Sequence, residues 1–205
     1  MISHRYKCIF IHIPRTCGSF IEKYVFEENV NEQEKHLTAD LAKQYYKQYW
    51  DEYIKFSIIR DPWARIYSLI RLDHNYANCS LIDGKIIDIE GYVSRYTFNG
   101  IPIEIDHRYN QITNNIQANY KKSMMYTNFI GEEMDYVLDY DDLVDRLPLL
   151  LDELEIDFDM SNIKRPSKKY NQYYTTESRN QVLSLHEAEL DKYNLQFGTG
   201  KLNDL

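Results

Sequence analysis

Two segments of this chain show the same succession of local signals: an apolar run, then a turn, then a helix. They cover residues 8–19 and 56–68. In both, β-branched and aromatic residues favour a strand, and a proline follows. Because strands alternate with helices along the chain, we predict an α/β fold with a mainly parallel sheet flanked by helices.

The first segment ends in a small polar loop with the groups needed to hold a phosphate or sulfate. Arg15 supplies a cation, Thr16 and Ser19 supply hydroxyls, and Gly18 supplies a flexible backbone. The helix that follows would direct backbone N–H groups and a positive dipole end at the anion. The GxxxxGK[ST] spacing of a nucleotide triphosphate loop is missing from the sequence, which disfavours a kinase or an ATPase.

The second segment has a sharp strand-to-helix boundary. Asp61 suits the N-cap, and Pro62 suits the first helical position, where no N–H is needed. Arg60 then ends the strand, and Ser68 lies about two turns along the helix. We predict that Arg60 and Ser68 share one phosphate, with the guanidinium acting as a permanently charged, bidentate fork.

Residues 13–19 and 59–68 resemble two motifs of the sulfotransferases that use 3′-phosphoadenosine 5′-phosphosulfate (PAPS), especially the branch of the heparan sulfate 2-O-sulfotransferases and their bacterial relatives. The first is similar to the Pro-Lys-Thr-Gly-Gly-Thr loop, which holds the 5′-phosphosulfate. The second is similar to the Arg-Asp/Asn-Pro-aromatic-x-Arg-x-x-Ser segment, which holds the 3′-phosphate. The resemblance implies that PAPS is bound by Arg15, Thr16, Cys17, Gly18, Ser19, Arg60 and Ser68.

Further segments extend the resemblance in the same order. Residues 36–39 are similar to a His-x-Thr-Ala helix entry, residues 136–143 to a later strand-to-helix segment, and residues 173–175 to a Tyr-Tyr-Thr element. The resemblance implies a P-loop NTPase-like three-layer fold, with residues 1–205 forming a single sulfotransferase domain. It also adds Tyr173 to the cofactor site, with Lys168 from a basic tract that either folds over the cofactor or is a solvated loop.

Sulfuryl transfer requires an acceptor hydroxyl to attack sulfur while negative charge grows on the leaving phosphate. The resemblance assigns stabilisation of that charge to Arg15 and makes His36 the general base, a role that suits a side chain titrating near neutral pH. The alternative role of His36 is packing beside the helix that follows. His12 is expected to support the site from the core, and His107 is a second candidate base. Neither the histidine nor the cysteine spacing indicates a metal, so none is expected.

Two residues depart from the family pattern. Arg15 stands where the family usually has Lys, and Cys17 stands where it has a small residue. These departures leave open a catalytically degenerate module that binds the nucleotide or a glycan without transfer. A cysteine phosphatase is disfavoured, because its loop needs Cys-x5-Arg and Lys23 stands at that position. The expected acceptor, a carbohydrate or other hydroxyl-bearing molecule, rests on the resemblance alone.

Composition narrows the partners and the compartment. The net charge of −8 has the wrong sign for a general nucleic-acid binder. Three cysteines without paired or metal-type spacing favour a reducing compartment. The sequence offers no apolar run long enough for a signal peptide or a membrane span, so we expect a cytoplasmic protein.

The remaining signals predict the other elements. We expect a helix capped by Thr38 and running to about residue 49, followed by strand 53–59 and helix 61–75. Further along, we expect an insertion or hairpin in 78–91, short helices in 90–119, strand 136–139, and helices 141–154 and 176–193. The first of these two helices is indicated by leucines at helical spacing, at positions 143, 147, 150, 151 and 154.

Overall fold

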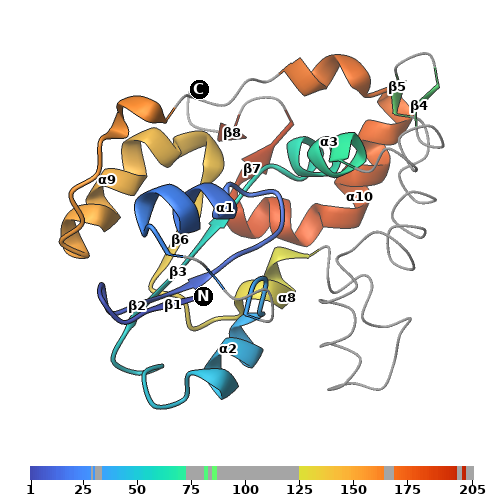
Figure 1. Ribbon diagram of the computed structural model, residues 1–205. Helices are drawn as coiled ribbons and strands as arrows, with labels where there is room; N and C mark the ends of the chain where they lie inside the picture. Colours follow the sequence, from blue (N-terminus) through green and yellow to red (C-terminus); the bar gives the residue numbers. More distant parts are fainter. Residues whose placement is uncertain are drawn as a thin grey trace. The chain divides into compact units, whose positions relative to one another are not determined.

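The computed structural model describes residues 1–28, 30, 34–72, 81–82, 85–86, 125–163, 169–197 and 200–201 (Figure 1). The chain divides into two compact units. Unit 1 comprises Met1–Arg60 and Tyr126–Pro166, and unit 2 comprises Asp61–Met125 and Ser167–Leu205. Organisation of the whole chain as a single domain stays a prediction.

Unit 1 is built on a mixed sheet of four strands in the order β1-β2-β3-β6. Strand β1 (Ile2–Ser3) pairs antiparallel with β2 (Cys8–Ile11), whereas β3 (Ile54–Ile59) pairs parallel with both β2 and β6 (Tyr136–Asp139). In this register Ile11 faces Ser57, and Ile59 faces Asp139. The predicted α/β class, with a mainly parallel sheet flanked by helices, is confirmed. The short strand β1 was not predicted.

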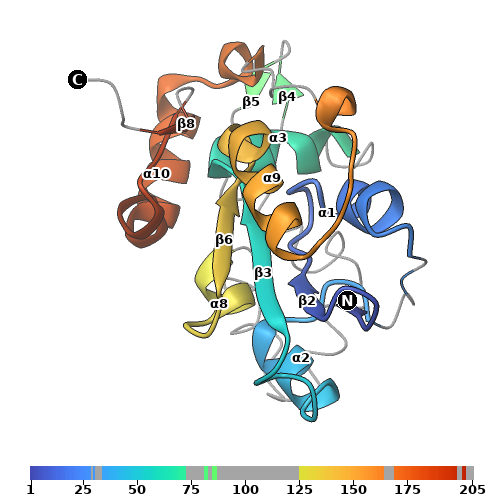
Figure 2. The same cartoon turned by 90° about the vertical axis from the view of Figure 1, so that its left-hand side faces the viewer.

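Helices α1 (Gly18–Phe20) and α9 (Leu143–Glu153) cover one face of this sheet (Figure 2). A π-helical stretch, η1 (Ile21–Val25), directly follows α1. The core beneath them is formed by every second residue of the strands and by the leucines of α9 whose spacing predicted a helix. It contains Cys8, Phe10, Phe56, Ile58, Leu138, Leu143, Leu147, Leu150 and Leu151. The intervening strand residues Ile9, Ile11 and Ile59 are also buried, as expected for a parallel sheet.

Two further helices of unit 1 lie beside each other, α2 (Ala39–Tyr45) and α8 (Tyr126–Ile130) (Figure 1). The predicted cap of α2 is confirmed, since Thr38 Oγ1 accepts a hydrogen bond from the Leu41 N–H at 3.4 Å. The helix ends at Tyr45, earlier than predicted, and turns follow. Helix α8 was not predicted. The described part of the unit also contains two 3₁₀ segments, η2 (Tyr140–Asp142) and η3 (Met160–Asn162).

Unit 2 contains α10 (Thr176–Tyr193), as predicted, and α3 (Pro62–Leu72), which falls within the predicted helix 61–75, whose last three residues lie outside the described ranges. It also contains a 3₁₀ segment, η4 (Lys169–Tyr173). Its described strands form two antiparallel pairs, β4 (Leu81–Ile82) with β5 (Lys85–Ile86), and β7 (Leu195–Gln196) with β8 (Gly200–Lys201). The first pair confirms a hairpin within residues 78–91. The short helices expected in 90–119 lie outside the described residues.

No helix in the described ranges combines the length and apolar character that crossing a membrane demands. The cytoplasmic location stays a prediction.

Candidate functional site

Within unit 1, the sheet brings the first motif and Arg60 to the same edge. Strands β2 and β3 are parallel neighbours, so the residues that follow Ile11 and Ile59 leave the sheet from their carboxyl ends. There, Nη1 of Arg60 donates a hydrogen bond to the carbonyl oxygen of Arg15 at 3.3 Å. The carboxyl edge of parallel strands is the usual position of ligand sites in open α/β sheets.

The loop backbone holds non-glycine residues in a left-handed conformation. Within the loop, Arg15 has φ 69° and Cys17 has φ 79°; outside the loop, His36 has φ 63°. These three predicted site residues are among the seven described non-glycine residues with positive φ. Because L-residues adopt this conformation at a cost, it persists only where the surrounding structure imposes it, and such residues cluster at functional sites.

The loop side chains divide into exposed and buried groups. Arg15 and Ser19 are exposed, whereas Thr16 is fully buried and donates its hydroxyl hydrogen to the Ile13 carbonyl oxygen at 2.8 Å. The structure therefore gives Thr16 a role in stabilising the loop.

Gly18 lies directly against the His12 ring, because an added Cβ would lie 1.9 Å from His12 Cδ2. A side chain at position 18 is excluded unless that ring moves.

Cys17 lacks the character of a nucleophile. Burial raises the pKa of its thiol to about 11, although the positive charge of Arg60 acts in the opposite direction. At neutral pH the side chain is a protonated thiol, and the thiolate is the reactive form. This is a structural reason to set the phosphatase interpretation aside.

Arg60 is fixed through both its guanidinium and its backbone, yet its Nε–H remains as a donor for an anion. Its guanidinium lies over the Tyr140 ring, with Cζ 4.7 Å from the ring centroid, and its carbonyl oxygen accepts a hydrogen bond from the Tyr126 hydroxyl. Its Nε is buried and has no hydrogen-bond partner among the residues that the structure describes. A buried N–H without an acceptor is costly, so an anion here would supply what the protein does not. The donor set fits a phosphate.

His36 is neutral and has a fixed orientation. Burial lowers its pKa to about 3, and the nearby His12 contributes in the same direction. Its Nδ1 lies 2.9 Å from the His12 carbonyl oxygen. A carbonyl oxygen can only accept, so Nδ1 carries the proton and Nε2 keeps its lone pair. This tautomer can receive a proton at Nε2, as a general base must.

In unit 2, Asp61 and Trp63 of the second motif stabilise the fold. Asp61 caps α3, with Oδ1 accepting from the Ala64 N–H at 2.7 Å, and its Oδ2 accepts from the buried Tyr170 hydroxyl at 2.6 Å. The Trp63 indole N–H donates to the Arg179 carbonyl oxygen at 3.1 Å, and the Trp63 carbonyl oxygen accepts from Tyr174 at 2.8 Å. These contacts attach the chain around residues 170–179 to the start of α3.

The other predicted cofactor residues belong to unit 2. Ser68 is half-buried on α3, and Tyr173 lies against the same helix, because its ring stacks on that of Tyr67 with centroids 4.7 Å apart. Ser68 directly follows that tyrosine in the chain, and Tyr173 stacks on the tyrosine ring. Lys168 and the candidate base His107 lie outside the described residues.

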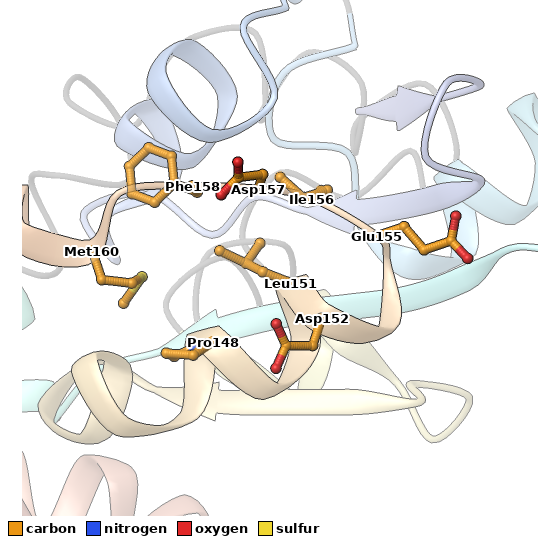
Figure 3. Close-up of a pocket in the computed structure, with 8 residues that line it drawn as sticks. All are labelled: Pro148, Leu151, Asp152, Glu155, Ile156, Asp157, Phe158 and Met160. Atoms are coloured by element: carbon orange, nitrogen blue, oxygen red, sulfur yellow. The ribbon is translucent and has the colours of Figure 1, made fainter.

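A cavity in unit 1 lies away from these residues. Figure 3 shows it between α9 and the segment after it, with Leu151 on its floor and Phe158 and Met160 at its side. Its other lining residues include the carboxylates Asp152, Glu155 and Asp157. Three negative charges at its border make it a poor site for an anionic nucleotide. Within the described ranges, no three His, Cys, Asp or Glu side chains are grouped so that they could hold a metal ion.

Sequence reasoning missed three supports of the site: Tyr140 beneath Arg60, Tyr126 on its carbonyl oxygen, and Glu22, whose Oε1 lies 2.7 Å from His12 Nδ1. A signal existed for Tyr140. It directly follows strand β6, whose parallel pairing with β3 sends it to the same edge as Arg60. Glu22 had no such signal, since only the fold turns its carboxylate toward the core.

No protein-family model matches the chain, and neither curated proteins nor solved structures gave a match.

Proposed function

We propose that this chain is a PAPS-dependent sulfotransferase with a P-loop NTPase-like three-layer fold, acting on a hydroxyl of a carbohydrate or similar acceptor. The observation that carries the proposal is the meeting of the 13–19 loop with Arg60 at the carboxyl edge of the sheet, where a buried Arg60 Nε faces no acceptor among the described residues. The motif resemblance supplies the identity of the anion.

In this proposal, PAPS supplies the sulfuryl group and leaves as PAP. Arg15 and Ser19, which are exposed on the loop, hold the 5′-phosphosulfate, and the half-buried Cys17 and the Gly18 backbone shape its seat. Arg60, braced by Tyr140, supplies a second fixed positive charge. Charges held in place before the reaction stabilise negative charge that develops on a leaving phosphate. The roles of Ser68, Lys168 and Tyr173 toward the cofactor stay predictions.

His36 is the proposed base. Its Nε2 lone pair is the proton acceptor, and the hydrogen bond from Nδ1 to the His12 carbonyl oxygen keeps it in that tautomer. A pKa of about 3 makes a weak base. A polyanion bound nearby favours the protonated imidazolium and so raises this pKa, which brings His36 closer to the range where proton transfer is efficient.

The first test is a thermal-shift titration with PAP, compared with ATP and Mg²⁺. A ligand that binds only the folded state raises its apparent stability. We expect a saturable shift with PAP that Arg60→Ala abolishes. The matched control is Arg5→Ala, because Arg5 also lies over a tyrosine ring, with Cζ 4.9 Å from the Tyr6 centroid, outside the site. A shift with ATP alone, or none with PAP, contradicts the proposal.

Binding without transfer is the second candidate, and the low pKa of His36 favours it. It predicts a PAP shift equal to that of an active enzyme, but no transfer of labelled sulfate from PAPS to a panel of hydroxyl acceptors. Transfer that is lost in His36→Gln, with PAP binding retained, would exclude this candidate.

A further inference from the structure

His12 lies between the sheet and the loop and contacts the loop directly. Its ring is 3% exposed, and an ideal Cβ at Gly18 would lie 1.9 Å from its Cδ2 and 2.2 Å from its Nε2. The loop backbone at Gly18 therefore rests on the edge of this ring. Phe10 stacks on the ring, with centroids 5.7 Å apart and planes 12° from parallel. Movement of the ring would displace the loop.

Glu22 fixes the orientation of that ring. Its Oε1 lies 2.7 Å from His12 Nδ1, and Glu22 as a whole is 5% exposed. An ionised carboxylate only accepts hydrogen bonds, so His12 carries a proton on Nδ1. A charge-assisted hydrogen bond away from water is strong and directional. The imidazole is thus held at one end by Glu22 and presents its other end to Gly18.

The same residue reaches the proposed base through its backbone. The His12 carbonyl oxygen accepts from His36 Nδ1 at 2.9 Å, and the two ring centroids are 4.2 Å apart. One residue therefore contacts both the loop that is proposed to hold the sulfuryl donor and the side chain that is proposed to take the acceptor's proton.

We propose that His12, oriented by Glu22, is a positioning residue that sets both the shape of the 13–19 loop and the tautomer of His36. The effect of this role on transfer rests on the sulfotransferase function proposed above, whereas the contacts of His12 with Glu22, Gly18 and His36 are independent of that function. Glu22 acts through His12 and has no contact with a reacting group in this assignment. Glu22 affects the site by holding the His12 ring in one orientation.

The test uses the ¹⁵N chemical shifts of the histidine ring nitrogens at neutral pH, which distinguish a protonated from a bare nitrogen. In the wild type we expect a protonated Nδ1 and a bare Nε2 for His36, and a protonated Nδ1 for His12. Glu22→Met removes the acceptor at similar volume and should change the His36 tautomer ratio and the amide signals of residues 15–19. Glu22→Gln keeps an acceptor oxygen and should restore most of the wild-type pattern.

PAP affinity gives a second readout. We expect the Kd to rise by about tenfold in Glu22→Met and by less in Glu22→Gln, as when a supporting residue behind a ligand-binding group is lost. Glu27→Gln, which neutralises an exposed carboxylate nearby in the chain, is the control and should change neither readout. Because a purely volume-filling role would make Met and Gln equivalent, the difference between these variants identifies the hydrogen bond as the cause.

A wild-type His36 that is protonated at Nε2 would overturn the inference, as would a folded Glu22→Met with unchanged ring and loop signals. If Glu22→Met does not fold, the wild-type and Glu22→Gln spectra decide. If PAP fails to bind the wild type, the proposed function fails, whereas the ring signals still decide whether His12 positions His36 and the loop.

Discussion

The loop at residues 13–19 in unit 1 and the start of α3 in unit 2 look alike in sequence but are stabilised in different ways. At α3, Asp61 caps the helix, with its Oδ1 2.7 Å from the Ala64 nitrogen, and Pro62 occupies the first turn of an 11-residue helix. At the loop, Cys17 occupies the N-cap with φ 79° and gives no side-chain cap among the described residues; a three-residue helix follows and turns into a π-helix.

The difference separates local from tertiary stabilisation. The position of the start of α3 is specified by a cap and a proline adjacent in sequence, and residues 170–179 then attach to it. The loop adopts a backbone that its own residues disfavour and depends on the buried ring of His12 beneath Gly18. Strain held by the surrounding structure is typical of functional sites. The free energy of unfolding should therefore be sensitive to different kinds of substitution in the two regions.

The largest expected effect is at Gly18. Gly18→Ala places a Cβ within 1.9–2.4 Å of three His12 ring atoms, so a buried, hydrogen-bonded ring must move. We expect a loss of about 3 kcal/mol or more in the free energy of unfolding, measured with urea. Gly131→Ala is the matched control, because its φ is +58° but its Cβ would meet only Ala39 at 3.9 Å. It should cost about 1–2 kcal/mol, and equal losses would refute the ring contact.

At the start of α3, Asp61→Ala removes the cap and the acceptor for Tyr170 together. We expect a loss of about 2–3 kcal/mol, the sum of a lost cap and of a lost buried hydrogen bond. Asp61→Asn keeps an acceptor oxygen and should lose less.

A double-mutant cycle with Tyr170→Phe isolates the second contact. Residues in contact share interaction free energy, so the coupling should be about 1 kcal/mol. Additive losses would mean that the cap alone explains the importance of Asp61.

The buried imidazoles give the first region a pH dependence. The His36 pKa is lowered from 6.5 to about 3, so between these values the unfolded chain binds a proton that the folded chain does not. Stability is therefore fully present above pH 6.5 and falls as the pH decreases toward 3, by at most about 1.4 kcal/mol per pH unit for this group. His36→Gln should show a shallower decrease in urea unfolding from pH 7 to 4. Parallel curves would mean that His36 titrates normally.

Much of the fold was predictable because its signals are local. Strand β6 and helix α10 begin and end at the predicted residues, and the leucines of α9 are buried as their spacing indicated. Asp61, Pro62 and Thr38 also act at helix starts as predicted. Each of these depends on residues within a few positions of one another.

What was not predictable depends on contacts between distant residues. Nothing near Glu22 in sequence indicates that its carboxylate meets His12, and nothing near Tyr140 shows that Arg60 lies over its ring. Thr16 carries a hydroxyl of the kind that can bind an anion, yet this hydroxyl donates its hydrogen to a backbone carbonyl oxygen of the same loop. The sequence indicated which loop matters, whereas the fold determines which of its groups face solvent.

The smallest expected effect concerns the backbone at Cys17. In a left-handed conformation Gly avoids the Cβ cost, so Cys17→Gly should be more stable than Cys17→Ala by about 1 kcal/mol. At Arg146, exposed in α9, the order should reverse, with Ala more stable than Gly by about 1 kcal/mol. The two pairs compare a strained position with a relaxed helical one, by urea unfolding. If the Ala variant is more stable than the Gly variant at both positions, the backbone at Cys17 is in the right-handed helical conformation. Backbone strain would then not distinguish the loop from the start of α3.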